Sequence, residues 1–335
     1  MKKLYFFLVV MTGIFMVVAA FLDDSFRFFS PMPSWVAKPN ANGNENEVEF
    51  EAEVLYDEYT DLRNYMVELI NRDRQKFGLR PVRLHKLASQ FGQGHSEEEA
   101  QFGYLSHWAI DGTKPYVRWS KLGGIEHVSE NVFARAGSAT LSPQDSTLFA
   151  EAQESLMRSP GHRANILDPH HNAVGIGIAL DQTEKKFYLC QEFIDRYLTL
   201  EDFPRQVHRR QKVRIAGKVL HSDYGIYFCR VTYEPFPAPL LPTALDSLSA
   251  YLDSGEQTVL SLGPWALGVN AKKGTFAFEI DFAKQATKAG YYYLVLYVKK
   301  DRGQIPYSRA GNERATTAEA IPATSVVFEI RDEVN

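Results

Sequence analysis

The chain has few cysteines and no excess of positive charge, and both absences narrow what it can be. Its 335 residues include only Cys190 and Cys229, whereas small secreted domains stapled by disulfides carry more. The fold must therefore depend on a hydrophobic core, and one bridge or two buried thiols both stay open. A net charge of -4 excludes a generally basic nucleic-acid-binding protein, although a local basic patch is compatible with it.

Charge is also missing from residues 4–22, and this gap is the strongest targeting signal. Two lysines precede the apolar run and two aspartates follow it, which is the arrangement of a secretory signal. Because positive residues stay in the cytoplasm, the rest of the chain is expected outside it. The run is long enough to span a bilayer, so residues 1–22 are either a cleaved signal peptide or a retained signal anchor. No cysteine follows the run, which argues against a lipoprotein anchor.

The length of the chain allows two domains, and changes in composition indicate where they lie. Residues 23–53 contain three prolines and an acidic stretch, which predicts a linker. Residues 54–200 alternate helical and strand patterns, whereas residues 208–335 are dominated by strands. The junction between these two parts is polar, so we expect separately folding domains with a protease-sensitive connection.

Apolar periodicity predicts the elements of the first domain. Helices are expected over residues 55–77, 84–103, 143–158 and 162–167, and a strand hairpin over residues 173–180 and 186–194. Ser142 and Pro143 are typical of a helix start. Glu97 to Glu99 are expected in solvent.

The second domain is expected to be an all-β sandwich. Its strands are predicted at residues 213–220, 225–233, 258–262, 275–282, 291–299 and 325–331, with one helical insert near residues 245–252. Alternation places Phe276, Phe278, Ile280 and Phe282 on one face of a strand. The three consecutive tyrosines at residues 291–293 indicate a buried strand, with a sugar-stacking platform as the alternative.

Several short motifs follow one another between residues 58 and 196. They are LINRDR at residues 69–74, GYLSH at 103–107, SEN at 129–131, SPGHRANIL at 159–167, VGIGIA at 174–179 and QEF at 191–193. In order and spacing they resemble the CAP superfamily (cysteine-rich secretory, antigen 5 and pathogenesis-related 1, or SCP-like) in its bacterial form. The resemblance implies an α/β fold, an α-β-α sandwich with a cleft, and it does not extend to residues 200–335.

Members of that superfamily typically line the cleft with two histidines and two glutamates. By motif, His107 and His162 match the histidines and Glu130 matches the first glutamate. Ser159 occupies the position of the second glutamate, so the motif does not support a mechanism that needs two carboxylates. The resemblance implies a ligand cleft that contains His107, Glu130, Asn131, Ser159 and His162.

Two neutral imidazoles facing one cleft can bind zinc or another divalent cation, so His107 and His162 are the candidate metal ligands. Glu130 can orient an imidazole or take a proton from bound water, which makes it the candidate catalytic residue. The leading hypothesis is an extracytoplasmic ligand-binding or envelope-associated module. The alternatives are a metal-assisted hydrolase of envelope peptidoglycan or protein, and a purely structural or adhesion protein.

The partner is open among a cell-envelope polymer, a protein and a small apolar ligand, and a membrane is contacted only through residues 4–22 if they are retained. Other candidate sites have simpler interpretations. Ser106 and Ser159 could be nucleophiles with His107 or His162 as base. No Gly-x-Ser-x-Gly elbow is present, however, and both serines suit helix or turn capping.

Three further histidine and glycine patterns also have simpler interpretations. His170 and His171 are adjacent in a polar turn, which is favoured over a metal pair. His95 and Glu99 have helical spacing, and a solvated or capping role is favoured over metal binding. The glycines of the VGIGIA motif lack the third glycine of a dinucleotide-binding loop.

Overall fold

The structure is a computed structural model that describes most of the chain after the predicted linker. The described residues are 53–137, 146–181, 183–248, 250–251, 255, 257–300, 302–305 and 320–331. The apolar run at residues 4–22 and the predicted helix start at Ser142 and Pro143 lie outside these ranges. Within them, no helix is both long enough and apolar enough to cross a membrane.

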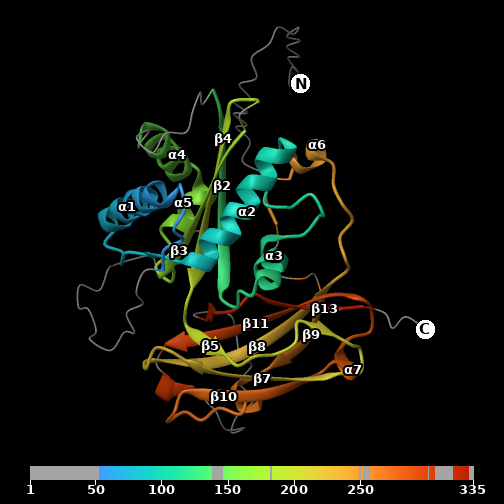
Figure 1. Cartoon of the computed structure of the whole chain (residues 1–335). Helices are drawn as coiled ribbons and strands as arrows, with labels where there is room; N and C mark the ends of the chain where they lie inside the picture. The colour runs from blue at the N-terminus through green and yellow to red at the C-terminus, as the bar shows by residue number, and fades with distance from the viewer. Residues whose placement is uncertain are drawn as a thin grey trace, which may run out of the picture. The chain divides into compact units, whose positions relative to one another are not determined.

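A four-stranded sheet forms the middle layer of the N-terminal module, with the strand order β1-β3-β4-β2 (Figure 1). The strands are β1 (Arg83–Leu84), β2 (His127–Ala136), β3 (Ala173–Asp181) and β4 (Lys186–Asp195). β3 and β4 form the predicted antiparallel hairpin, and β2 pairs antiparallel with the other side of β4. The sequence did not predict β2, which is the strand that carries Glu130.

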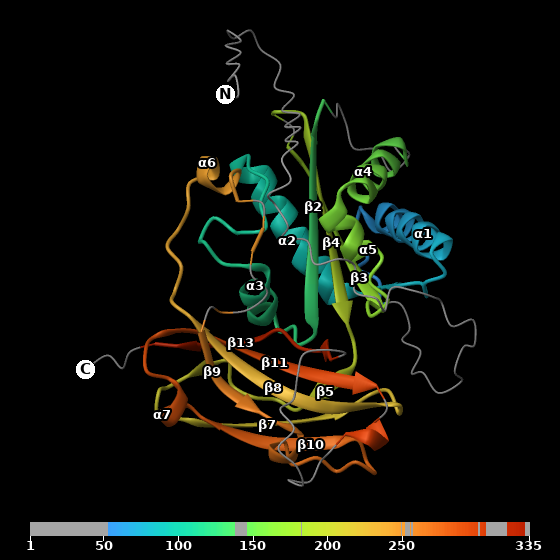
Figure 2. The same cartoon turned by 180° about the vertical axis from the view of Figure 1, so that it is seen from behind.

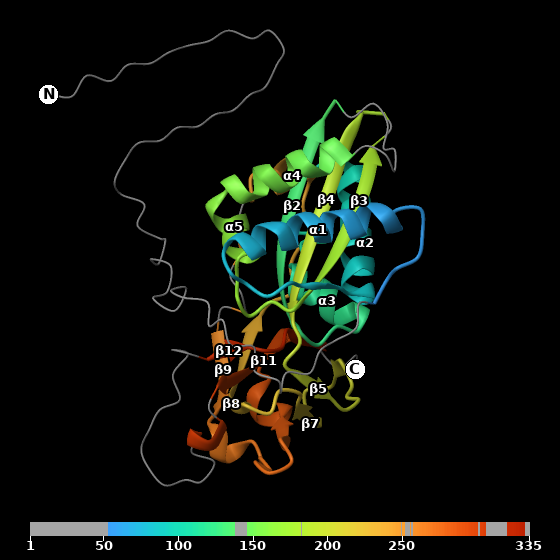
Figure 3. The ribbon, with the colours of Figure 1, turned by 90° about the vertical axis from the view of Figure 1, so that its left-hand side faces the viewer.

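Helices cover both faces of this sheet, as the side view in Figure 3 shows. One layer contains α1 (Thr60–Lys76), α4 (Ser146–Arg158) and α5 (Pro160–Ile166), and the other contains α2 (Lys86–Phe102) and α3 (Pro115–Leu122). Met66 and Phe149 pack with Ile176 on one face of the sheet. Phe91 and Trp119 belong to the apolar cluster on the other face. The predicted α-β-α sandwich is confirmed, while α3 is a helix that the sequence did not predict.

The ends of the first two helices follow local capping chemistry. The His85 side chain accepts the Ala88 N–H at 3.2 Å and starts α2, and Gly103 ends it with a φ of 72°. The prediction that α1 begins at residue 55 is wrong. The Thr60 hydroxyl accepts the Asp57 N–H at 2.8 Å, and this turn holds the chain out of the helix until Thr60.

Two glycines of β3 bring α2 into backbone contact with the sheet. A Cβ atom on Gly175 would lie 2.0 Å from the carbonyl carbon of Ala88, and one on Gly177 would lie 2.1 Å from that of Gly92. No side chain fits in these spaces, so glycine is required there. The glycines of the VGIGIA motif therefore serve helix packing.

The C-terminal module consists of two β-sheets packed over one core. The first sheet has the order β10-β7-β5, and the second has the order β6-β13-β11-β8-β9 with β12 beside β11. The strands are β5 (Leu198–Leu200), β6 (Gln206–Val207), β7 (Lys212–Val219), β8 (Tyr224–Glu234), β9 (Gln257–Leu262), β10 (Thr275–Asp281), β11 (Gly290–Lys300), β12 (Ile321–Pro322) and β13 (Val326–Ile330). The core joins residues of both sheets, such as Ile215 and Phe276 with Val231 and Leu294. The β-rich sandwich prediction is confirmed.

The tyrosine strand and the helical insert of this module can be compared with their predictions. Tyr291, Tyr292 and Tyr293 are buried, so the interpretation as a buried strand is confirmed and the sugar platform is excluded. The predicted helical insert near residues 245–252 is misplaced, because the helix there is α6 (Pro242–Leu245). α7 (Phe282–Gln285) is a further short helix after β10.

Helix α3 of the first module contacts β13 of the second. The Ser120 hydroxyl accepts the N–H of Val327 at 2.9 Å. Arg205 donates to the carbonyls of Gly123 and Gly124, which follow α3, at 3.0 and 3.2 Å. Separate folding of residues 54–200 and 208–335 stays a prediction.

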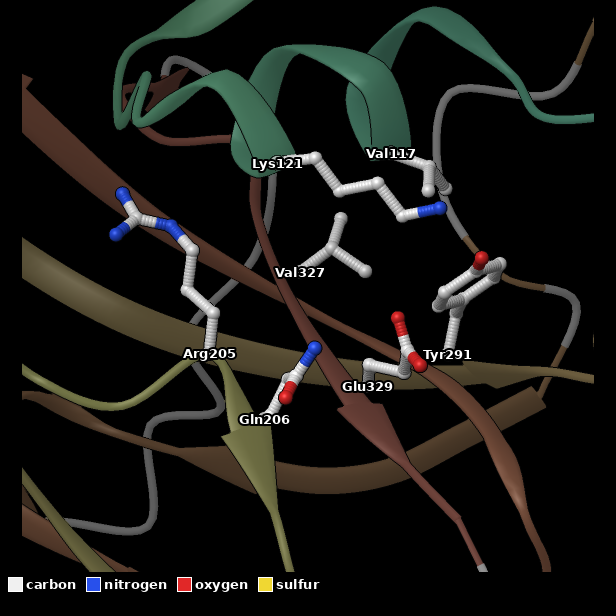
Figure 4. Close-up of a pocket in the computed structure, with 7 residues that line it drawn as sticks. All are labelled: Val117, Lys121, Arg205, Gln206, Tyr291, Val327 and Glu329. Carbon is white, nitrogen blue, oxygen red and sulfur yellow. The ribbon is translucent and has the colours of Figure 1, made fainter.

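A cavity of about 190 Å³ lies at this junction between the modules. Figure 4 shows Val117 and Lys121 of α3 on one side of it, and Tyr291 and Glu329 of the sheet on the other. The Lys121 ammonium lies 5.4 Å from the centre of the Tyr291 ring.

The two cysteines lie in different modules. Cys190 belongs to β4 and Cys229 to β8. Both are buried free thiols, so the alternative of a disulfide between them is excluded and the fold depends on its apolar cores.

Candidate functional site

Glu130 fixes the orientation of His107. His107 lies in the loop between α2 and α3, and its Nδ1 is 2.9 Å from Oε1 of Glu130. Arg118 of α3 donates to the other Glu130 oxygen at 3.1 Å and to the His107 carbonyl at 2.9 Å. Burial alone would raise the pKa of Glu130, but the Arg118 guanidinium and the hydrogen bond from His107 lower that pKa well below its usual range. An ionised Glu130 accepts the Nδ1–H of His107, which leaves the lone pair on Nε2.

His162 approaches His107 from α5. The centroids of the two rings are 6.5 Å apart. Burial, with a further contribution from the nearby His107, lowers the pKa of His162. His162 is therefore neutral at pH 7 and retains a lone pair for a ligand. The structure thus brings together His107, Glu130 and His162 from three segments that are distant in the sequence.

Asn131 links this site to a buried network of amides. Its Nδ2 donates to the backbone carbonyl of His162 at 3.2 Å and to Oε1 of Gln191 at 3.1 Å. Asn165 of α5 donates to Oδ1 of Asn131 at 2.9 Å. Since Asn131 is fully buried, its contribution is to position α5 and with it His162.

The amide network continues to α1. Gln191 donates to Gln153 at 2.9 Å, and Gln153 donates to a carboxylate oxygen of Asp73 at 3.0 Å. These side chains are at most 7% exposed. The chain of donors and acceptors therefore fixes α4 and the last turn of α1 relative to the strand pair that holds the site.

The two serines considered as nucleophiles have structural roles. Ser106 accepts the N–H of Trp108 and donates to the carbonyl of Leu248, both at 3.3 Å. Ser159 is the N-cap residue of α5 but makes no side-chain capping bond. Its carbonyl accepts the N–H of Arg163 at 2.8 Å. Ser159 therefore shapes the entry into the helix that carries His162.

His95 and Glu99 are both buried, which corrects the expectation that they are solvated. Burial lowers the pKa of His95 to about 3, and its Nε2 donates to the carbonyl of Ser106 at 2.8 Å. Burial, with the charge of Glu130, raises the pKa of Glu99 well above its usual range. Glu99 accepts the Ser106 N–H at 3.2 Å. This pair is neutral and holds the backbone next to His107.

Glu192 is a further acidic residue of the site that the sequence did not indicate. It lies opposite Glu130 in the register of β4 and β2. Its side chain is fully buried, and neither oxygen accepts a hydrogen bond from the described residues. Burial and the charge of Glu130 raise the pKa of Glu192 well above its usual range. A protonated Glu192 avoids a second negative charge beside the ionised Glu130.

The donors available to a cation are the two imidazoles. Within the ranges that the structure describes, no three His, Cys, Asp or Glu side chains are grouped as a metal site. Zinc binds imidazole nitrogen at about 2.0–2.1 Å, which places two ligating rings with centroids about 5–6 Å apart. The observed 6.5 Å between the ring centroids of His107 and His162 is slightly wider than this range. Two imidazoles would supply two of the four positions around a zinc-like ion, and a ligand or water would have to fill the others.

The pair His170 and His171 does not form a site. Nδ1 of His171 is 2.7 Å from Asp195, and its ring stacks on Phe193. His170 instead approaches the hydroxyl of Tyr197. The two side chains have separate partners, which agrees with the interpretation as a structural turn.

Comparisons with known proteins identify the first module. Residues 67–193 match the family model CAP, described as the Cysteine-rich secretory protein family. The uncharacterized protein YkwD of Bacillus subtilis (strain 168) is 29% identical over 113 residues, which make up 33% of this chain and 40% of YkwD.

Two solved structures are also similar to part of the chain. An extracellular protein containing an SCP domain from Bacillus anthracis str. Ames is 24% identical, with a TM-score of 0.33 and 40% of each chain covered. An outer surface protein from Borrelia burgdorferi is 14% identical, with a TM-score of 0.34, and the match covers 43% of this chain and 98% of the Borrelia protein. The match to this chain spans 40% of the length of YkwD and of the Bacillus anthracis protein.

Proposed function

Because residues 67–193 form a CAP domain, we propose that this module binds its ligand outside the cytoplasm through a divalent cation held by His107 and His162. The observation that carries the proposal is the 2.9 Å hydrogen bond between His107 and Glu130. A carboxylate on one ring nitrogen fixes the tautomer and makes the other nitrogen a better metal ligand. His162, neutral and 6.5 Å away between ring centroids, supplies the second imidazole.

The charges near the cleft support a modest affinity. Glu130 is the ionised carboxylate beside His107, and Arg118 already compensates part of its charge. Glu99 and Glu192 are kept neutral by burial and by the charge of Glu130. A divalent ion would therefore gain little carboxylate stabilisation, so the ion and its ligand are expected to exchange readily.

An extracytoplasmic location is proposed from the N-terminal sequence. Residues 4–22 carry no charge and follow two lysines, as in a segment that directs export. Release of a shortened soluble form would indicate a cleaved signal peptide. Retention in the membrane fraction after a high-salt wash would indicate a retained anchor.

The geometry favours ligand binding over hydrolysis. A hydrolase of this type needs a carboxylate that takes a proton from bound water. Both oxygens of Glu130 are engaged by His107 and Arg118, the side chain is 2% exposed, and its pKa is lowered. Such a carboxylate is a weak base with little access to substrate. Incubation of the protein with peptidoglycan and with casein, with and without zinc, tests this distinction, and no turnover is expected.

The proposal is tested by calorimetric titration of zinc into the full chain in mild detergent. The native protein should bind one zinc ion, and the His107→Ala/His162→Ala variant should bind none. A matched His208→Ala variant changes an exposed histidine of the second module and should keep the site. Circular dichroism should show the same secondary structure in all three proteins.

Two results would contradict the proposal. An unchanged titration in the double variant would move the ion to other histidines, such as His170. An absence of zinc binding in the native protein would favour the structural or adhesion alternative.

A further inference from the structure

A segment of the second module runs along the loop that carries His107. This segment, residues 235–248, follows β8, contains α6 and is called the strap here. Figures 1 and 2 show it in orange on the α2 and α3 side of the CAP domain. The Leu240 N–H donates to the carbonyl of Ile110, and a carboxylate oxygen of Asp246 accepts the N–H of Leu105, both at 2.9 Å. The strap is therefore bound at both ends of the His107 loop.

Glycine at position 112 allows this close approach. Gly112 has a φ of +80°, and a Cβ atom there would lie 2.3 Å from the carbonyl oxygen of Ala238 in the strap. Any side chain would push the strap away from the loop. Next to the strap, Lys114 forms an ion pair with Glu234 at the end of β8, and both side chains are largely buried.

Beyond the strap, Tyr251 lies against His107. The centroids of the two rings are 5.1 Å apart, in an edge-to-face arrangement. The same tyrosine ring contacts Trp108 at 5.8 Å and Tyr116 at 5.7 Å, also edge to face. His107 is only 9% exposed. Its ring is thus enclosed by Glu130 on Nδ1, by His162 nearby and by an aromatic residue from the other module.

We propose that Tyr251 determines access to His107 and so sets the size of ligand that the CAP cleft accepts. A bare ion can pass the tyrosine ring, whereas a ligand that carries a ring of its own must displace Tyr251 to reach the imidazole. The second module is then part of the binding site. This inference rests on the proposed function, since it assigns a selectivity residue to the same cleft.

Edge-to-face aromatic pairs contribute about 0.5–1.5 kcal/mol each, so the closed position of Tyr251 is held by forces that a ligand can overcome. A purely structural Tyr251 would instead support the apolar cluster around Tyr116 and leave the reactivity of His107 unchanged when it is replaced. The two interpretations therefore differ in what happens at one imidazole.

The test is acylation of histidines by diethyl pyrocarbonate, mapped by mass spectrometry on the full chain without added metal. Its readout is the rate at His107 divided by the rate at the exposed His208. Tyr251→Ala should raise this ratio about tenfold, because the aromatic contacts that keep the ring closed are lost. Tyr251→Phe should keep the native ratio. Leu241→Ala is the matched control, since Leu241 is a strap residue that is 73% exposed.

Folding is monitored in the same experiment by His95 and His171, which are each 3% exposed and should stay unmodified. If His95 and His171 react in Tyr251→Ala, that variant has unfolded, and the Asp246→Ala variant is used in its place. Asp246→Ala releases the strap from Leu105 without removing an aromatic ring. It should then raise the His107 ratio as well. An unchanged His107 ratio in the folded Tyr251→Ala variant would overturn the proposal. If Tyr251→Ala is unfolded, an unchanged ratio in Asp246→Ala would overturn it. Because no metal is added, failure of zinc binding would not alter this result.

Discussion

Replacing Glu192 by glutamine tests the protonation of the buried acidic group opposite Glu130. The amide has the shape of a protonated carboxyl, but it does not titrate. In the unfolded chain, Glu192 ionises near pH 4.3. In the fold, burial and the Glu130 charge raise its pKa well above that value. The folded protein therefore holds one more proton than the unfolded chain in the interval between the two pKa values.

The sign and size of the effect follow from this extra proton. Stability contributed by a carboxyl with a raised folded pKa is present at low pH and is lost as the pH rises toward the folded pKa. One proton corresponds to about 1.4 kcal/mol per pH unit. Between pH 5.5 and 7.0 the native protein should lose up to about 2 kcal/mol from Glu192. The Glu192→Gln variant should not lose this stability. Contributions from the other titratable groups cancel when the free energies of unfolding of the two proteins are subtracted at each pH.

The assay is urea unfolding followed by tryptophan fluorescence at pH values from 5.5 to 8.0. Glu99→Gln should change the pH slope in the same direction, because the pKa of Glu99 is also raised. Glu130→Gln should instead destabilise the protein, since it removes the ionised partner of Arg118 and His107. Equal pH slopes for Glu192→Gln and the native protein would show instead that Glu192 is ionised in the fold.

Three further predictions concern packing, pH and the junction. Gly177→Ala should destabilise the protein by at least about 2 kcal/mol in urea unfolding, because the added Cβ meets the backbone of Gly92. Gly94→Ala, on the open side of α2, should stabilise the protein by about 1 kcal/mol. Similar effects of the two changes would contradict the close contact at Gly177. Burial, with a contribution from His107, lowers the pKa of His162. Zinc titrations should therefore lose affinity on acidification only below the usual range of a histidine, where protons begin to compete for His162. An affinity that rises on acidification would exclude this ligand. Limited trypsin digestion should first cut within residues 201–210, and an intact junction after prolonged digestion would show that the modules do not separate there.

The elements with regular apolar patterns could be predicted from the sequence. In β10 the alternation of Phe276, Phe278 and Ile280 places all three in the core, and the strand hairpin of β3 and β4 was bounded within a residue or two. β2 was missed because buried polar residues break its alternation: Glu130 and Asn131 lie side by side in its centre and are both buried. Local pattern carries no information about a polar pair that only the neighbouring strand and helices satisfy.

The candidate site was predicted through its motifs, but its surroundings were not. Glu99 and Glu192 carry charge in isolation, so the sequence favours solvent for Glu99 and gives no reason to pair Glu192 with Glu130. Burial in the fold and the register of β2 with β4 determine both outcomes. The approach of Tyr251 to His107 depends on a contact between residues that are far apart in the chain. No spacing rule connects them.

A crystal structure of the protein grown with zinc, in which anomalous scattering locates the metal, is the decisive measurement for the proposed cation site. We expect one peak at about 2.0–2.1 Å from Nε2 of His107 and from a ring nitrogen of His162, with Glu130 still bonded to Nδ1 of His107. A peak at His95, His170 or His171 instead, or side chains of His107 and His162 that remain apart around an empty cleft, would contradict the proposed cation site.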